Sequence, residues 1–334
     1  MSNTYDAFNS WKPLLYRDRI EQILDGVFPD PVTVHIYPTN RCNRDCRWCI
    51  MREERKGNAQ LPEFVFADLI ATLVACSDVK AIHIAGGGEP TLYPHLDHIS
   101  RFQGLKVLST NGSILSRSTA SRFDRIRVSL DAGTKQTFDQ VHGPGPSWEQ
   151  TIERIELCAY QGRSYQLGLG MVADWDNWGD IPAMCSIAEA LALDFVHIRP
   201  AYYPRGTDEE KRVRSVAGAI YHAAEAAKQV CSVPVFAISE KFDGFWTPQQ
   251  YTQCRATPLQ AVVNADARLS VCLDVFHKFG NLNTQTFWEA WQSDEHRQAI
   301  EAIKLYDCPR CVMNKANEII ENCFINDELL GGLL

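Results

Sequence analysis

The chain has 334 residues, 45% of them hydrophobic, and its 33 basic and 41 acidic residues give a net charge of −8. No basic stripe is visible, which argues against nucleic acid as a partner. The N-terminus has no signal-peptide pattern, and no apolar run approaches the roughly 18–20 residues of a membrane span, so we expect a cytoplasmic protein without a membrane partner. Twelve cysteines in a reducing compartment then indicate metal binding or redox chemistry rather than disulfides.

Six short apolar runs predict β-strands, and the helical patterns between them predict a parallel sheet built from βα units. A helical lead-in over 1–30 comes first, and the runs lie at 31–39, 79–90, 105–112, 125–133, 165–174 and 195–204. Six units are too few to close an eight-stranded barrel, so we expect an α/β fold with a partial (β/α)6 TIM-like barrel over 31–206. A helical bridge over 207–250 and a small α+β domain over 251–334 complete the prediction.

Polar or glycine-rich segments follow five of the predicted strands, and they read CNRDCRWC, GGGEP, STNG, SLDAG and RPAYYP in chain order. Because the carboxyl ends of parallel strands meet at one edge of a sheet, we expect these segments to converge on one rim of the barrel. His83 alternates with apolar residues inside the second run and is interpreted as a core or structural residue.

Three thiols, Cys42, Cys46 and Cys49, lie within eight positions after the first predicted strand. Thiolates suit zinc and iron–sulfur clusters, and three of them would leave one iron of a [4Fe–4S] cube without a protein ligand. S-adenosylmethionine (SAM) fits that vacancy, because its amine and carboxylate can chelate one iron. One-electron reduction then splits a C–S bond of SAM and yields a 5′-deoxyadenosyl radical, which can take hydrogen from an unactivated C–H bond. A zinc site remains the alternative at this point.

The ordered set of motifs on successive strands resembles the radical SAM superfamily over roughly residues 31–205. The resemblance implies that Cys42, Cys46 and Cys49 hold the cluster and that Trp48 packs on the adenine of SAM. It also implies that the methionyl amine of SAM is bound by the turn of Gly87, Gly88 and Glu89. Ser129 would contact the ribose or the carboxylate of SAM. Thr110 and Asn111 would face either the cofactor or the substrate. A one-electron donor such as flavodoxin or ferredoxin is the implied partner.

Four further cysteines, separated by spacers of 17, 35 and 2 residues, are Cys254, Cys272, Cys308 and Cys311. Their close pair is compatible with half of a zinc ribbon. The arrangement resembles the twitch domain, a shortened relative of the SPASM domain, which implies a second, auxiliary [4Fe–4S] cluster with these four ligands. Ala267 stands where that domain usually has glycine. A cluster with no open iron would accept or conduct electrons, or act as a brace.

Length and cysteine spacing resemble aminocyclitol dehydrogenases that carry a twitch domain. The resemblance implies hydrogen abstraction from a small polar substrate, such as a sugar, an aminocyclitol or a nucleoside, in natural-product (antibiotic) biosynthesis. The outcome would be dehydrogenation or epimerisation, and epimerases of this group return a hydrogen from a thiol. Cys185, Cys231 and Cys323 are candidate donors, with Cys323 favoured. Arg199 ends the sixth predicted strand, and a charge there needs a polar partner, so we expect it to contact substrate or cofactor.

Two other classes of protein stay open. A radical SAM enzyme that modifies peptides is one, although such enzymes often carry an N-terminal leader-binding domain and only about 30 residues precede the first predicted strand here. A non-catalytic zinc or iron–sulfur protein is the other. The aromatic and acidic segment 174–178 fits either a polyhydroxylated ring or the capping of a helix N-terminus.

Overall fold

The computed structural model describes residues 11–237, 239–246, 249–273, 277–308, 311 and 313–326. Its centre is one ten-stranded sheet with the strand order β10-β9-β8-β1-β2-β3-β4-β5-β6-β7. The strands are β1 (Thr33–Ile36), β2 (Ala81–Ile84), β3 (Leu105–Thr110), β4 (Arg125–Ser129), β5 (Gln166–Ala173), β6 (Phe195–Pro200), β7 (Val235–Ala237), β8 (Gln260–Val263), β9 (Leu269–Ser270) and β10 (Lys278–Phe279).

The strands from β8 through β1 to β7 are all parallel to their neighbours, whereas β9 and β10 are antiparallel. The sheet curves without pairing β7 to β8, so the barrel is incomplete, as predicted. The six expected strands are β1 to β6. Two further parallel strands flank them, and β7 lies inside the segment predicted to be a helical bridge. With only three residues, β7 is too short to produce a readable period in the sequence.

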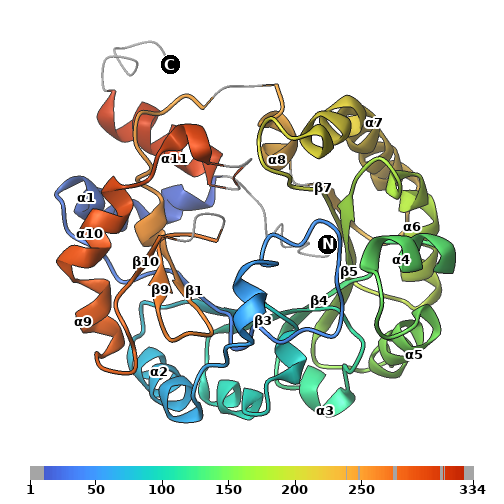
Figure 1. Cartoon of the computed structure of the whole chain (residues 1–334), viewed down its shortest axis with the longest axis horizontal. Helices are drawn as coiled ribbons and strands as arrows, with labels where there is room; N and C mark the ends of the chain where they lie inside the picture. Colours follow the sequence, from blue (N-terminus) through green and yellow to red (C-terminus); the bar gives the residue numbers. More distant parts are fainter. Residues whose placement is uncertain are drawn as a thin grey trace.

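Helices α2 to α7 lie on the outer, convex face of the curved sheet, where Figure 1 shows them as an arc around the strands, and the other helices lie near its two ends. The helices are α1 (Arg17–Leu24), α2 (Glu63–Ala75), α3 (Arg117–Ala120), α4 (Lys135–His142), α5 (Trp148–Cys158), α6 (Ile181–Ala190), α7 (Asp208–Val230), α8 (Ser239–Asp243), α9 (Phe287–Trp291), α10 (Asp294–Glu301) and α11 (Asn314–Ile320). None of the described helices is both long enough and apolar enough to cross a membrane.

Local sequence explains why these helices begin and pack as they do. At the start of α5, Ser147 and Gln150 form a capping box, in which each side chain accepts from the other residue's backbone N–H. Thr207 caps α7 and is followed by three acidic residues that suit the positive end of the helix dipole. Helix α2 buries Val65, Phe66, Leu69, Ile70 and Leu73 against the sheet at helical spacing.

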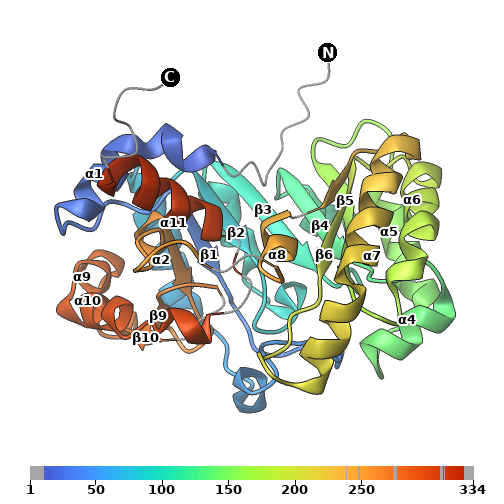
Figure 2. The same cartoon turned by 90° about the horizontal axis from the view of Figure 1, so that it is seen from above.

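The C-terminal segment is built into the barrel. Strand β8 pairs along the whole length of β1, with Thr33 opposite Gln260 and Ile36 opposite Val263. Beyond it, the antiparallel strands β9 and β10 and the helices α9 and α10 lie at the β1 end of the sheet, as Figure 2 shows. The indole N–H of Trp291 donates to the Pro29 carbonyl at 2.9 Å, which fixes α9 to the segment that leads into β1.

Candidate active site

The cysteine loop after β1 and the glycine turn after β2 pack backbone against backbone. The Gly88 N–H donates to the Thr39 carbonyl and the Glu89 N–H to the Arg41 carbonyl, both at 2.8 Å. A Cβ atom on Gly88 would lie 2.0 Å from the Arg41 carbonyl oxygen, and one on Gly87 would lie 2.0 Å from Asn40 Oδ1. The two glycines are therefore required for this close approach.

Two of the three loop thiols have polar neighbours. Cys46 Sγ lies 3.1 Å from Nδ1 of His142, at the end of α4, and Arg55 Nη1 donates to Cys49 Sγ over 3.6 Å. Burial raises the pKa of the Cys42 and Cys46 thiols, and the neighbouring thiols raise it further. A cation bound among the three sulfurs would reverse this effect, because it stabilises thiolate.

The donor set fits an iron–sulfur cube better than a single ion. Among the residues that the structure describes, no three His, Cys, Asp or Glu side chains are grouped so that they could hold one metal ion. A [4Fe–4S] cube is ligated at separate irons, so its thiolates need not meet at one point. Soft thiolates without a carboxylate in the set are the ligands that such clusters prefer.

Glu89, in the turn after β2, is buried and accepts four hydrogen bonds. Its Oε1 accepts from the Thr91 N–H at 3.0 Å, the Thr91 hydroxyl at 2.5 Å and the Thr110 hydroxyl at 2.6 Å, and its Oε2 accepts from the Asn111 N–H at 2.6 Å. Burial raises the pKa of this carboxyl, and the hydrogen bonds oppose that rise. The carboxylate thus ties the turn after β2 to the end of β3.

Thr110 and Asn111, predicted to face cofactor or substrate, both hold neighbouring loops in place. Thr110 is 3% exposed, and its hydroxyl donates a hydrogen bond to the carboxylate of Glu89. The Asn111 amide donates to Asn43 Oδ1 in the cysteine loop at 2.8 Å. Three motifs that lie far apart in the chain therefore meet at one edge of the sheet, as expected.

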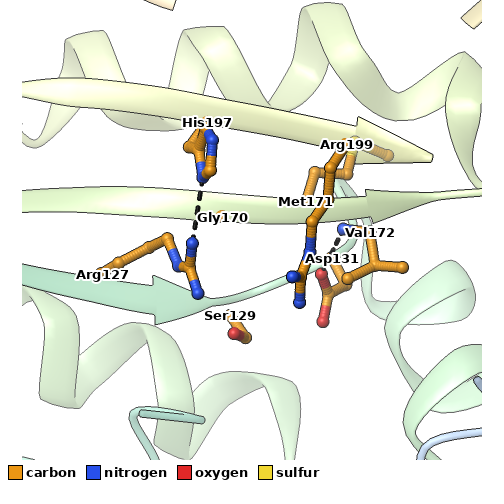
Figure 3. Close-up of a pocket in the computed structure, with 8 residues that line it drawn as sticks. All are labelled: Arg127, Ser129, Asp131, Gly170, Met171, Val172, His197 and Arg199. Atoms are coloured by element: carbon orange, nitrogen blue, oxygen red, sulfur yellow. Dashed lines mark hydrogen bonds between the residues drawn. The ribbon is translucent and has the colours of Figure 1, made fainter. Parts of the chain in front are cut away.

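A narrow pocket opens inside the barrel beside Ser129, with a cavity volume of about 10 Å³, room for about one water molecule. Figure 3 shows Arg127, Asp131 and Arg199 facing this space. Its full lining is Arg127, Ser129, Asp131, Gly170, Met171, Val172, His197 and Arg199. Ser129 and Arg199, predicted separately, are thus brought together.

Arg127, Asp131 and His197 also line this pocket, and none of them was predicted from the sequence to be a site residue. The signal was present, because side chains two residues apart on a strand share a face. Arg127 precedes Ser129 by two residues on β4, and His197 precedes Arg199 by two on β6. Asp131 accepts a hydrogen bond at 2.7 Å from the Val172 N–H, and burial raises its pKa to about 6.

The segment after β5 is held by the cysteine loop. Arg47 contacts the carboxylates of Asp174 and Asp176, each at 2.5 Å, and stacks over Trp48 and Trp175. Both carboxylates are thus occupied by a protein partner, which favours the structural interpretation of this segment. Trp48, the predicted adenine contact, is 9% exposed and packs in the core.

Three of the four C-terminal thiols surround Tyr251. Burial raises the pKa of this phenol, and the nearby sulfurs of Cys311, Cys254 and Cys308 raise it further. The Tyr251 hydroxyl donates to Asn314 Oδ1 at 2.8 Å. The fourth predicted ligand, Cys272, is buried just after β9.

Ala267, before β9, has a φ of +61°, the left-handed conformation that glycine adopts without strain. This backbone geometry explains why glycine is usual at the position.

The three thiols proposed as hydrogen donors lie away from the pocket. Cys323 is exposed in the π-helical turn Glu321–Ile325 that follows α11. Cys185, on α6, and Cys231, which caps α7, are hydrogen-bonded to one another on the outer layer of helices. None of the three is among the residues that line the described pocket.

Comparison with known families agrees with this geometry. Residues 36–173 match the radical SAM superfamily, and the fold and the site together define a radical SAM domain. Residues 254–322 match SPASM, an iron–sulfur cluster-binding domain. The chain therefore consists of a radical SAM domain followed by a SPASM-type iron–sulfur domain, and its cofactors are SAM, the [4Fe–4S] cluster of the first domain and auxiliary iron–sulfur in the second.

Curated relatives resemble only part of the chain. Fe-coproporphyrin III synthase of Methanosarcina barkeri is 27% identical over 167 residues, which are 45% of this chain and 39% of that protein. A probable GTP 3′,8-cyclase of Saccharolobus islandicus is 28% identical over 171 residues, 48% of this chain and 54% of that protein. The match thus spans about half or less of either relative.

Solved structures extend the likeness of fold to most of the chain. Streptococcus suis SuiB bound to its precursor peptide SuiA superposes with a TM-score of 0.66 at 14% identity, over 93% of this chain and 78% of that one. The structure of anSMEcpe with bound AdoMet gives a TM-score of 0.61 at 14% identity, over 89% of this chain and 100% of that one. At this identity the likeness shows the fold alone.

Proposed function

We propose that this radical SAM enzyme removes hydrogen from a small polar metabolite, such as a sugar, cyclitol or nucleoside of a natural-product pathway, and oxidises it. The observation that carries the proposal is the polar pocket inside the barrel, lined by Arg127, Asp131 and Arg199 beside Ser129. Arg127 and Asp131 also have protein partners, but an apolar substrate would bury the guanidinium of Arg199 without a hydrogen-bond partner, at a cost of several kcal/mol.

In this proposal Cys42, Cys46 and Cys49 hold the SAM-binding cluster. Bound SAM supplies a 5′-deoxyadenosyl radical after one-electron reduction by a donor such as flavodoxin or ferredoxin. Gly87, Gly88 and Glu89 receive the methionyl end and Trp48 the adenine. Ser129 contacts the ribose or carboxylate, while Thr110 and Asn111 support the turn that carries Glu89.

Oxidation is favoured over epimerisation by the positions of the cysteines. A thiol that returns hydrogen to a substrate radical must reach the barrel interior. Cys323 is exposed after α11, and Cys185 and Cys231 are bonded to each other among the outer helices. An auxiliary cluster held by Cys254, Cys272, Cys308 and Cys311 would instead accept the second electron.

The cluster assignment is tested by anaerobic reconstitution. We expect about eight irons and eight sulfides per chain, as two [4Fe–4S] clusters require. Cys49→Ala should abolish 5′-deoxyadenosine formation on reduction with SAM, whereas Cys311→Ala should retain part of it and lose product. Cys158→Ala, at an isolated buried thiol on α5, is the matched control and should leave both iron content and SAM cleavage unchanged.

Four outcomes would contradict parts of the proposal. A Cys49→Ala enzyme that still forms 5′-deoxyadenosine refutes the site. Stoichiometric zinc without SAM cleavage would show a non-catalytic zinc protein. In deuterated water, deuterium in the product would show return of a hydrogen from an exchangeable thiol, and hence epimerisation. Turnover of a peptide but of no small metabolite would favour the peptide-modifying alternative.

A further inference from the structure

A chain of polar side chains crosses the floor of the barrel, where apolar residues usually fill the interior of such folds. His35 on β1 and His83 on β2 approach through their Nδ1 atoms at 3.1 Å, and His83 Nε2 lies 2.8 Å from the Ser109 hydroxyl on β3. Arg127 on β4 then bridges Ser109 Oγ, at 3.0 Å, and His197 Nδ1 on β6, at 3.1 Å. His83 is thus part of this layer and not of the apolar core.

Arg127 can span from β4 to β6 because β5 has a glycine between them. A Cβ atom on Gly170 would lie 3.0 Å from Cδ and 3.2 Å from Cγ of Arg127. In the register of the sheet, Gly170 stands between Ser129 of β4 and His197 of β6. A larger residue at this position would displace the guanidinium.

The histidines of the layer contribute dipoles rather than charge. Burial lowers the pKa of His35 to about 4, and burial lowers those of His83 and His197 well below the ordinary value. The charges that line the pocket are therefore Arg127, Arg199 and Asp131. Burial and the like charge of Arg199 lower the pKa of Arg127 to about 9, which still leaves it protonated at neutral pH.

The carboxylate of Asp131 only partly balances the positive charges of Arg127 and Arg199 in the pocket. Asp131 faces both guanidinium groups, but its Oδ1 already accepts from the Val172 N–H and its Oδ2 lies 3.6 Å from Nε2 of His142. Among the residues that the structure describes, Arg199 has neither a hydrogen bond nor an ion pair. A guanidinium has five N–H donors in a planar fork that matches a carboxylate or a phosphate.

We propose that this pocket binds an anionic group of the substrate, a carboxylate or a phosphate, between Arg199 and Arg127. The inference rests on the proposed function and narrows the substrate class. Two guanidinium groups repel a protonated amine, so the end of the substrate that enters the barrel is not the amino-bearing end of an aminocyclitol. The anion also holds the reacting carbon in a fixed position relative to the rim.

The depth of the pocket argues for the substrate rather than the carboxylate of SAM. The motifs predicted to hold SAM follow the carboxyl ends of β1 to β4. Arg127 lies two residues before Ser129, and the polar layer that it joins includes residues inside β1, β2 and β3. The anion therefore binds below the rim that the cysteine loop and the glycine turn form.

Small anions serve as probes, and their entry requires the side chains that line this narrow space to move apart. The reconstituted enzyme, saturated with SAM, is titrated with inorganic phosphate, acetate and acetamide at constant ionic strength, and binding is followed by thermal denaturation and calorimetry. We expect phosphate or acetate to bind and acetamide, the neutral isostere of acetate, not to bind. Arg199→Gln should weaken anion binding about 10- to 100-fold, the effect of losing a charge-assisted contact. Comparison of the affinities for phosphate and acetate shows whether the site prefers a phosphate or a carboxylate group.

The matched control is Arg205→Gln, which removes an exposed arginine from the loop after the same strand. It should leave anion binding unchanged. Gly170→Ala is a second variant that keeps every charge and requires the side chain of Arg127 to shift by a few tenths of an ångström, so it should weaken anion binding less than Arg199→Gln does. The affinity for SAM is measured in parallel, because Ser129, the predicted contact to its ribose or carboxylate, also lines this pocket. In Arg199→Gln it should fall much less than the affinity for the anion.

Three results would overturn the inference. Equal binding of acetamide and acetate, or no anion binding at all, excludes an anion site. Unchanged anion binding in both Arg199→Gln and Gly170→Ala excludes this pocket. Loss of SAM affinity in parallel with anion affinity assigns the arginines to the cofactor. Failure of the proposed function is distinguishable, because it is measured on the wild type by 5′-deoxyadenosine formation and by the product formed, and not by anion binding.

Discussion

At the scale of single residues, Glu89 shows how one side chain organises the site. Its two oxygens accept from two backbone N–H groups and two hydroxyls, so every contact requires an acceptor. The carboxylate thereby fixes the turn after β2, which in turn packs on the cysteine loop. An amide of the same shape cannot replace it, because an NH2 group would face donors.

We expect Glu89→Gln to lower the free energy of unfolding by about 1–3 kcal/mol, the cost of buried donors that lose their acceptor. SAM binding should weaken as well. Urea denaturation and SAM titration measure the two effects. Glu53→Gln, which alters an exposed ion pair with Lys56, is the control and should stay within about 0.5 kcal/mol of the wild type. A stable Glu89→Gln enzyme with normal SAM affinity would contradict this role.

The residue scale also shows which roles the sequence indicated. Residue type and spacing predicted the thiols to be cluster ligands, and the resemblance to the radical SAM superfamily implied cofactor contacts for the glycine turn and Ser129. The sequence did not predict definite roles for Thr110 and Asn111. In the structure both side chains donate hydrogen bonds to residues of other motifs, Thr110 to Glu89 and Asn111 to Asn43. The pairing of Arg47 with Asp174 and Asp176 could not be foreseen, because 127 positions separate Arg47 from Asp174.

At the scale of elements, the site depends on contact between two loops from neighbouring strands. The loop after β1 and the turn after β2 approach so closely that Gly86, Gly87 and Gly88 have no room for a Cβ atom. The second and third of these contact the cysteine loop directly. The order of the cysteine loop therefore depends on glycines about 40 positions away.

Gly88→Ala should displace the loop, because its Cβ would lie 2.0 Å from the Arg41 carbonyl oxygen. We expect a loss of about 1–3 kcal/mol of stability. Iron bound after reconstitution should fall toward the four atoms of one cluster, as iron analysis would show. Gly179→Ala is the matched control, since no atom lies within 4 Å of the place that a Cβ would take there and its backbone is unstrained. Equal iron content in the two variants would argue against loop packing as the determinant.

Elements were predicted well where the pattern was long. Strands β1 to β6 fall inside their expected ranges. Strand β7 was missed because three residues define no period. The pairing of β8 with β1 was not expected. Hydrogen bonding between residues 33 and 260 is a long-range event that local sequence does not encode.

At the scale of the whole molecule, buried neutral histidines link stability to pH. Burial lowers the pKa of His35, His142 and His296 to about 4, and it lowers those of His83 and His197 well below the ordinary value. Below pH 6.5 the unfolded chain binds protons that the folded chain excludes. The stability that these residues contribute is therefore present above pH 6.5 and is lost as the pH falls toward 4.

We expect the free energy of unfolding to fall between pH 6.5 and 5 by up to about 1.4 kcal/mol per pH unit for each such histidine. His296→Gln should reduce this slope by about one proton. This residue stacks on Phe279, donates to the Trp291 carbonyl and lies away from the predicted ligands. His222→Gln, at an exposed position on α7, should leave the slope unchanged. Denaturation across this pH range tests the prediction, and identical slopes in the three proteins would contradict it.

The class of protein, a radical SAM enzyme with a second iron–sulfur domain, could be predicted from the sequence alone. The spacing of three thiols, the glycine turn and the alternation of strands and helices are local patterns, and their chemistry follows from residue type. Which side chains line the interior of the barrel depends on the tertiary structure and could not be read from the sequence. Arg127, His197 and Arg199 come from strands β4 and β6, and they share a pocket because the sheet curves and Gly170 leaves space between them. Burial and proximity of charge arise from folding, so the polarity of the interior could not be inferred from the order of residues.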